Sequence, residues 1–158
     1  MSIKNSVNIS LSVNGESFDN VTVPTRQHLA DFLRSQGLTG THLGCEQGAC
    51  GACTIEMDGK AVRSCLILAS QANGSSITTV EGFDDEEMEK VKNNFLKHNA
   101  FQCGFCSPGM LMTTKEIISS KKKLSRDEIR SEICGNYCRC TGYQSIVDAI
   151  EESINEIN

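Results

Sequence analysis

The chain has 158 residues and a formal net charge of −5, and its 39% hydrophobic and 22% charged residues are ordinary for a globular protein. The acidic balance argues against a nucleic-acid binder, because such proteins usually carry a basic patch. The N-terminus lacks the apolar stretch of a signal peptide, and no segment approaches the roughly 18 apolar residues of a membrane-spanning helix. We therefore expect a cytoplasmic protein that binds neither nucleic acid nor membrane.

The first half of the sequence, residues 1–82, is predicted to be rich in β-strands. Apolar and polar residues alternate over 7–13, which is the period of a half-buried strand, and Asn14-Gly15 after them is a strong hairpin signal. The other expected elements are a return strand through Val21 and Val23, a short helix with Leu29, Phe32 and Leu33 on one face, a second hairpin over 54–65 that turns at Asp58-Gly59, and a strand over 76–80.

The second half, residues 83–158, has the periodicity of helices. Ser125 followed by Glu128 is a capping-box pattern before a helix over 125–134, and Gly135 is a plausible stop. The other expected helices cover 85–98, a segment opened by Pro108-Gly109, and 141–154. Four helices are therefore predicted here, joined to the first half by a short connection.

Nine cysteines are unusual in a chain without an export signal, because a reducing cytosol disfavours structural disulfides. Cys45, Cys50 and Cys53 have the spacing C-x4-C-x2-C, and Cys65 follows; we call these four the first cysteine set. This spacing is typical of plant-type 2Fe–2S sites, and glycines between the cysteines let a loop wrap closely. Zinc is an alternative, although paired C-x2-C knuckles suit zinc better, and a disulfide framework is another.

A second cysteine set consists of Cys103, Cys106, Cys138 and Cys140, in which two pairs meet only through the fold. Each pair precedes a predicted helix, and a helix N-terminus favours the negative charge of a cluster held by thiolates. A second cluster is the favoured interpretation. A zinc site and a thioredoxin-like redox dithiol at C-x-x-C are the alternatives.

Cys134 lies outside both sets, on the helix predicted over 125–134, and we expect a small buried helical side chain there. A role as a swapped ligand is the alternative. The three histidines, His28, His42 and His98, do not make a Rieske arrangement, which needs two histidine ligands paired with two cysteines. We expect His42 to support the first cysteine set or to lie on the surface.

With both sets placed, the chain resembles the small iron–sulfur subunit of molybdenum hydroxylases of the xanthine dehydrogenase, aldehyde oxidoreductase and carbon monoxide dehydrogenase type. The resemblance covers essentially the whole chain. It implies an α+β fold, with a plant-ferredoxin-like β-grasp domain over 1–82 and a bundle of about four short helices over 83–158. It rests on four motifs in this order: GCEQGACGACT (44–54), VRSC (62–65), FQCGFCSPGM (101–110) and GNYCRCTGY (135–143).

The resemblance also implies the ligands. One 2Fe–2S cluster falls on Cys45, Cys50, Cys53 and Cys65, and the other falls on Cys103, Cys106, Cys138 and Cys140. Gln102 matches the family glutamine that hydrogen-bonds the pterin of the molybdenum cofactor, and Cys140 matches the ligand nearest the pterin edge. Position 134 is not a ligand in the family.

The implied function is electron relay inside a larger enzyme. A large molybdopterin-binding subunit hydroxylates the substrate, and electrons pass singly through the helical-domain cluster and the ferredoxin-type cluster, usually to FAD on a medium subunit. We expect a heterotrimer or a dimer of heterotrimers, and neither catalytic residues nor turnover in this chain alone. A free-standing ferredoxin-like carrier and a zinc-stabilised binding module are the rival interpretations; Gln102 and the second cysteine set argue against the free carrier.

Overall fold

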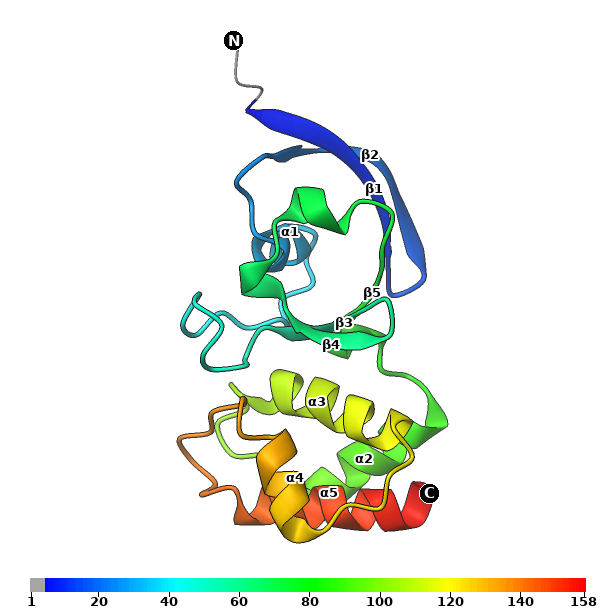
Figure 1. The fold of residues 1–158 in the computed structure, drawn as a ribbon, viewed down its shortest axis with the longest axis vertical. Coiled ribbons are helices and arrows are strands. Elements are labelled where there is room, and N and C mark those ends of the chain that lie inside the picture. Colours follow the sequence, from blue (N-terminus) through cyan, green and yellow to red (C-terminus); the bar gives the residue numbers. More distant parts are fainter. Residues whose placement is uncertain (1–4) are drawn as a thin grey trace.

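A computed structural model describes residues 5–158 and shows a sheet-containing half and a helical half that lie end to end along the long axis (Figure 1). The strands are β1 (Ser6–Val13), β2 (Glu16–Pro24), β3 (Thr54–Met57), β4 (Lys60–Arg63) and β5 (Ser76–Thr78). The helices are α1 (Leu29–Ser35), α2 (Glu86–Lys97), α3 (Ser107–Ser119), α4 (Arg126–Glu132) and α5 (Gln144–Ile157). The predicted α+β class is confirmed.

The five strands form one mixed sheet in the order β2-β1-β5-β3-β4. β1 and β5 run parallel, and the other neighbouring pairs are antiparallel. Both predicted hairpins are confirmed: Asn14 and Gly15 have φ of 52° and 83°, and Asp58 and Gly59 have φ of 51° and 79°. Two successive positive φ values match the right-handed twist of the strands, and Asn, Asp and Gly tolerate them.

Each half has its own hydrophobic core. In the sheet half, the inward residues of β1 pack with β5 and with α1, whose Leu29, Phe32 and Leu33 are buried. In the helical half, the apolar faces of α2, α3, α4 and α5 pack together, and Phe83 joins this second core. Ser125 and Glu128 form the predicted capping box of α4. The domain boundary after residue 82 agrees with these cores and stays a prediction.

Several element ends differ from the sequence-based expectation, among them the following three. β5 ends at Thr78 because the side chain of Asn14 hydrogen-bonds the backbone N and the hydroxyl of Thr79, each at 2.9 Å, in place of a strand partner. α5 begins at Gln144, because Tyr143 before it is left-handed with φ of 69°. α4 ends at Glu132.

The expectation for Cys134 is wrong. This residue lies beyond the end of α4 and is exposed. Ile133, which is 2% exposed, takes the buried position instead, and the chain turns there with a hydrogen bond of 2.9 Å from Asn136 N to Ile133 O. Where a cysteine and a larger apolar residue are neighbours in the chain, the sequence alone does not show which of the two side chains is buried.

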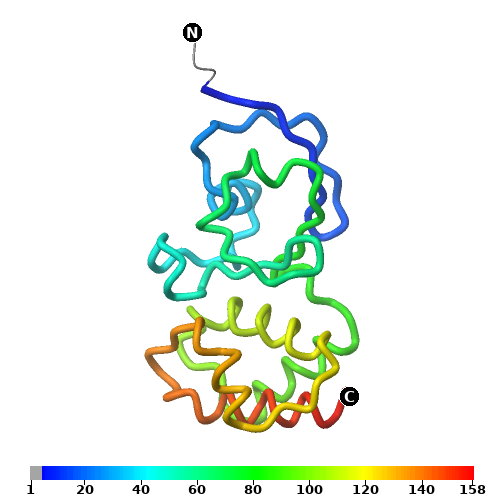
Figure 2. The backbone as a smooth tube through the Cα atoms, in the orientation of Figure 1, coloured from blue at the N-terminus to red at the C-terminus, as the bar shows by residue number. Residues whose placement is uncertain are grey.

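The two halves meet where α3 packs against the β3–β4 hairpin (Figure 1). Lys115 Nζ of α3 lies 3.2 Å from Glu56 Oε2, and Glu116 Oε1 accepts a hydrogen bond of 3.0 Å from Ala61 N. The loop through residues 45–53 and the loop through 135–143 protrude at the same side of the molecule (Figure 2). Within residues 5–158, no helix has both the length and the apolar character needed to cross a membrane.

Candidate metal centres

The first cysteine set lies in a tightly wrapped loop and at the end of β4. Glu46, Gly48 and Gly51 have φ of 54°, 81° and 73°, so the loop turns back on itself between its cysteines. Cys50 N donates to Cys45 Sγ over 3.3 Å. Positive φ is least costly at glycine, which explains why glycines recur between these thiols.

Cys65, the last member of the first cysteine set, lies in the short 3-10 helix Ser64–Leu66, which follows β4. Ser64 donates to Cys53 O from its backbone N at 3.2 Å and from its hydroxyl at 2.7 Å, which fixes Cys65 beside Cys53. Cys53 and Cys65 are each 2% exposed, whereas Cys45 and Cys50 are half-buried. One side of this set is therefore buried and the other approaches the surface.

Within the first cysteine set, Cys50 bears on the pKa of Cys45, and Cys53, with Cys45 to a lesser degree, bears on the pKa of Cys65. Hydrogen bonds from the amides of Gln47 and Cys50 lower the pKa of Cys45 to about 7. Burial, followed by the neighbouring Cys53 thiol, raises the pKa of Cys65 to about 11. The thiolate is the metal-binding form, so the loop amides stabilise negative charge on one side of this set.

The second cysteine set forms two pairs, and each joins distant segments. Cys106, the residue just before α3, contacts Cys138, and Cys103 contacts Cys140. Burial, and then the Cys138 thiol, raises the pKa of Cys106 to about 12. Burial also acts on Cys138, but hydrogen bonds from the hydroxyl and backbone of Thr141 outweigh it and lower the Cys138 pKa. The thiol of Cys103 raises the pKa of Cys140.

Four cysteines at each set fit a two-iron cluster, in which each iron takes two thiolates. In the second set, Cys103 and Cys106 lie beside thiols of the loop 135–143. A thioredoxin-like dithiol uses only the two cysteines of its C-x-x-C motif, so these further thiols favour a cluster. The donor chemistry therefore fits 2Fe–2S clusters at both sets, and the individual ligand assignments remain predictions.

His42, which was expected to support the first cysteine set or to lie on the surface, contacts the loop of the second set. Its ring stacks on Phe105, with centroids 4.9 Å apart and planes 19° apart, and its Nδ1 lies 2.8 Å from Phe105 O. Phe105 lies between Cys103 and Cys106. Sequence reasoning missed Phe105, together with Arg63 and Asn136, which also connect the two sets.

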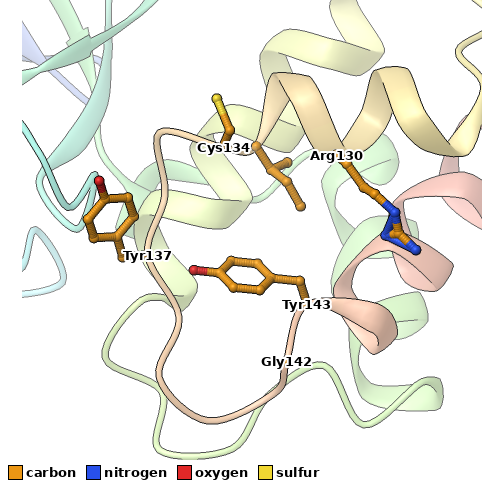
Figure 3. A pocket seen from close by; sticks show the side chains of 6 residues that line it. Arg130, Cys134, Tyr137, Gly142 and Tyr143 are labelled. Atoms are coloured by element: carbon orange, nitrogen blue, oxygen red, sulfur yellow. The ribbon is translucent and has the colours of Figure 1, made fainter.

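A pocket of about 370 Å³ lies beside the loop 135–143 (Figure 3). Arg130 reaches it from α4, and the rings of Tyr137 and Tyr143 flank it from the loop. Ile133, Cys134 and Gly142 complete its lining. The pocket is thus next to the second cysteine set, and none of the eight predicted ligands lines it.

Comparison with known proteins gives matches over both halves. Residues 12–90 match the family described as "2Fe-2S iron-sulfur cluster binding domain", and residues 79–151 match that described as "[2Fe-2S] binding domain". The small subunit of nicotine 6-hydroxylase from Paenarthrobacter nicotinovorans is 48% identical over 152 residues, covering 96% of this chain and 92% of the relative. Caffeine dehydrogenase subunit gamma from Pseudomonas sp. (strain CBB1) is 50% identical over 148 residues, covering 90% and 88%.

A solved structure gives the same result for the fold. A chain in the crystal structure of quinoline 2-oxidoreductase from Pseudomonas putida 86 superposes with a TM-score of 0.90 at 49% identity, covering 97% of this chain and 96% of that chain. The predicted ferredoxin-like domain, helical domain and pair of 2Fe–2S domains are thereby confirmed.

Proposed function

The chain belongs to the small iron–sulfur subunits of the xanthine dehydrogenase and aldehyde oxidoreductase family of molybdenum hydroxylases, and we propose that the eight cysteines of its two sets hold two 2Fe–2S clusters. It is an electron-transfer subunit of a multi-subunit oxidoreductase. When bound, each cluster supplies a carrier for one electron. The observation that carries the ligand assignment is the proximity of the thiols within each set, where a thiol of the same set shifts the pKa of Cys45, Cys65, Cys106 and Cys140.

The roles of the residues follow from the two sets. Cys45, Cys50, Cys53 and Cys65 hold one cluster in a domain over residues 1–82, and Cys103, Cys106, Cys138 and Cys140 hold the other in a domain over 83–158. Amides of the loop 45–53 donate to thiolate sulfur at the first cluster. At the second, Thr141 donates to Cys138. Such hydrogen bonds and burial tune the reduction potential of an iron–sulfur centre.

We propose that the second cysteine set faces the molybdenum cofactor of a large partner subunit. Gln102, Cys103 and Cys140 are all exposed, as contact with a group held by another subunit requires. Gln102 then hydrogen-bonds the pterin, and Cys140 is the ligand nearest to it. The chemistry on the substrate takes place on the large subunit, so this chain has no turnover alone.

The first cysteine set is proposed to face a medium subunit that binds FAD, in a cytoplasmic heterotrimer or dimer of heterotrimers. Leu66, directly after Cys65, is 62% exposed. Large apolar side chains exposed beside the ligands suit docking surfaces that a partner covers.

The test is the anaerobic iron and acid-labile sulfide content of the purified chain, with EPR after dithionite reduction. About four irons and four sulfides per chain, with two distinct signals, are expected for two 2Fe–2S clusters. Two irons and one signal in the native complex would instead support the rival interpretation of a ferredoxin-like carrier with one cluster. Zinc without sulfide would overturn the proposal.

A further inference from the structure

The loops that carry the two cysteine sets are joined through Asn136 and its neighbour. Asn136 is 1% exposed, and its Nδ2 donates to Gly51 O, in the first set's loop, over 3.2 Å. Its Oδ1 accepts from Thr113 Oγ1 of α3 at 2.9 Å. The backbone N of Tyr137 donates to Cys50 O at 2.8 Å, so a proposed ligand of one cluster is one hydrogen bond from the residue next to Cys138.

Glycines allow this close approach. A Cβ added to Gly51 would lie 2.4 Å from Gly135 O, and one added to Gly109 would lie 2.1 Å from Gly51 O. Real Cβ atoms do not come this close to a carbonyl oxygen, so the three backbones meet only because side chains are missing there. The glycines allow the backbones to approach, but they do not fix how the two loops are oriented relative to each other.

Arg63, at the end of β4, also joins the loop that contains Gly51 to the loop 135–143. Its Nη2 donates to Gly135 O at 2.8 Å and lies 3.5 Å from Asn136 Oδ1, and its Nη1 donates to Thr54 Oγ1. Thr54 Oγ1 in turn donates to Gly51 O at 2.6 Å. Gly51 O thus receives three hydrogen bonds, from the backbone N and the hydroxyl of Thr54 and from the side chain of Asn136.

We propose that Asn136 is a positioning residue that fixes the separation and orientation of the two clusters by tying Gly51 to the loop 135–143. The proposal rests on the ligand assignment made above. Asn136 touches neither set's sulfur in the hydrogen bonds described, so it acts through the backbone beside Cys50 and Cys138. Functional groups need a fixed relative geometry, and buried side chains that are themselves hydrogen-bonded supply it.

The test uses the assembled enzyme complex with Asn136→Asp. This change keeps an oxygen for Thr113 and Arg63, but it removes the donor to Gly51 O and places a carboxylate oxygen against that carbonyl. With both clusters reduced, their spins split each other's EPR signals by an amount that depends on their separation and orientation. We expect a changed splitting at unchanged iron content. Hydrogen exchange at the Tyr137 amide should accelerate by roughly tenfold, as losing one buried hydrogen bond implies.

The matched control is Asn94→Asp. Asn94 is likewise buried, at 5% exposed, but its Nδ2 donates to Ser153 Oγ and Glu156 Oε2 inside the helical half. This variant should lower stability and leave the EPR splitting and the Tyr137 exchange at their native values. If Asn136→Asp fails to assemble, Thr113→Val, which removes the hydroxyl that holds Asn136 Oδ1, is read in the same way.

The possible results distinguish a wrong ligand assignment from a wrong positioning role for Asn136. A native complex with fewer than two cluster signals refutes the ligand assignment itself. Two native signals, with unchanged splitting and unchanged Tyr137 exchange in a fully loaded Asn136→Asp variant, or in Thr113→Val where that one is used, overturn the positioning role. Equal changes in Asn94→Asp would show a general loss of stability and would overturn it as well.

Discussion

The hydroxyl of Tyr143 accepts a hydrogen bond of 2.8 Å from the backbone N of Cys138. Tyr143 is itself left-handed, with φ of 69°, directly before α5. Its ring therefore folds back over the loop that carries two proposed ligands, and Thr141 adds a contact of 3.1 Å to Cys138 Sγ. A non-glycine residue with positive φ costs energy that surrounding contacts must offset. This hydrogen bond is one of those contacts.

Tyr143→Phe should weaken the second cluster selectively. The substitution keeps the ring but leaves the partly buried N–H of Cys138 without its acceptor, at a cost of about 1–3 kcal/mol. In the presence of a chelator, the EPR signal of the second cluster should decay faster than that of the first in the same sample. Tyr137→Phe is the control, because that ring is 59% exposed. Equal decay of both signals in Tyr143→Phe would contradict the anchoring role.

Local signals in the sequence predicted much of the fold. Asn14-Gly15 and Asp58-Gly59 specify their hairpins because both residues of each pair accept the positive φ that the turn requires. Ser125 and Glu128 specify the start of α4 through hydrogen bonds three residues apart. Each of these features is determined by residues that are close together in the chain, so it can be predicted from the residue types alone.

Contacts between distant segments could not be predicted in this way. The pairing of Cys103 with Cys140, and the meeting of Asn136 with Gly51 across 85 positions, depend on how the two halves pack. The cysteine spacing indicated which thiols belong to one set, and the structure adds which thiols touch. The exposure of Cys134 was missed for the same reason, because α4 ends before it and Ile133 occupies the core.

Cys134 should be the one thiol that an alkylating reagent modifies in the fully loaded chain. It is exposed and lies outside both cysteine sets, whereas the other eight of the nine cysteines are proposed ligands. Treatment with iodoacetamide under anaerobic conditions should add a single label at Cys134, as peptide mass spectrometry would show. Cys134→Ser should take no label and should keep about four irons, as expected for two 2Fe–2S clusters. Loss of iron from the helical domain in that variant would make Cys134 a ligand.

Gly109→Ala should destabilise the protein although it lies in a helix. Alanine is normally favoured over glycine in a helix by about 1 kcal/mol. Here the new Cβ would lie 2.1 Å from Gly51 O, and such overpacking costs about 1–3 kcal/mol. Guanidinium unfolding of the loaded chain should give a lower midpoint than the native chain. Ser119→Ala, at an exposed position of α3, should change stability by less than about 0.5 kcal/mol. A stabilised Gly109→Ala variant would show that the two halves do not pack this closely.

Gln102→Ala should slow the assembled enzyme without removing iron. Gln102 is exposed beside Cys103, so its side chain is free to bond a group on a partner subunit, and no core packing is lost with it. Loss of one hydrogen bond of about 0.5–1.5 kcal/mol predicts up to roughly tenfold weaker cofactor contact or slower turnover. Iron content and both EPR signals should stay native. Gln36→Ala, at an exposed glutamine directly after α1, is the matched control and should leave turnover unchanged. Native turnover in Gln102→Ala would remove the proposed contact with the pterin while leaving the cluster assignment intact.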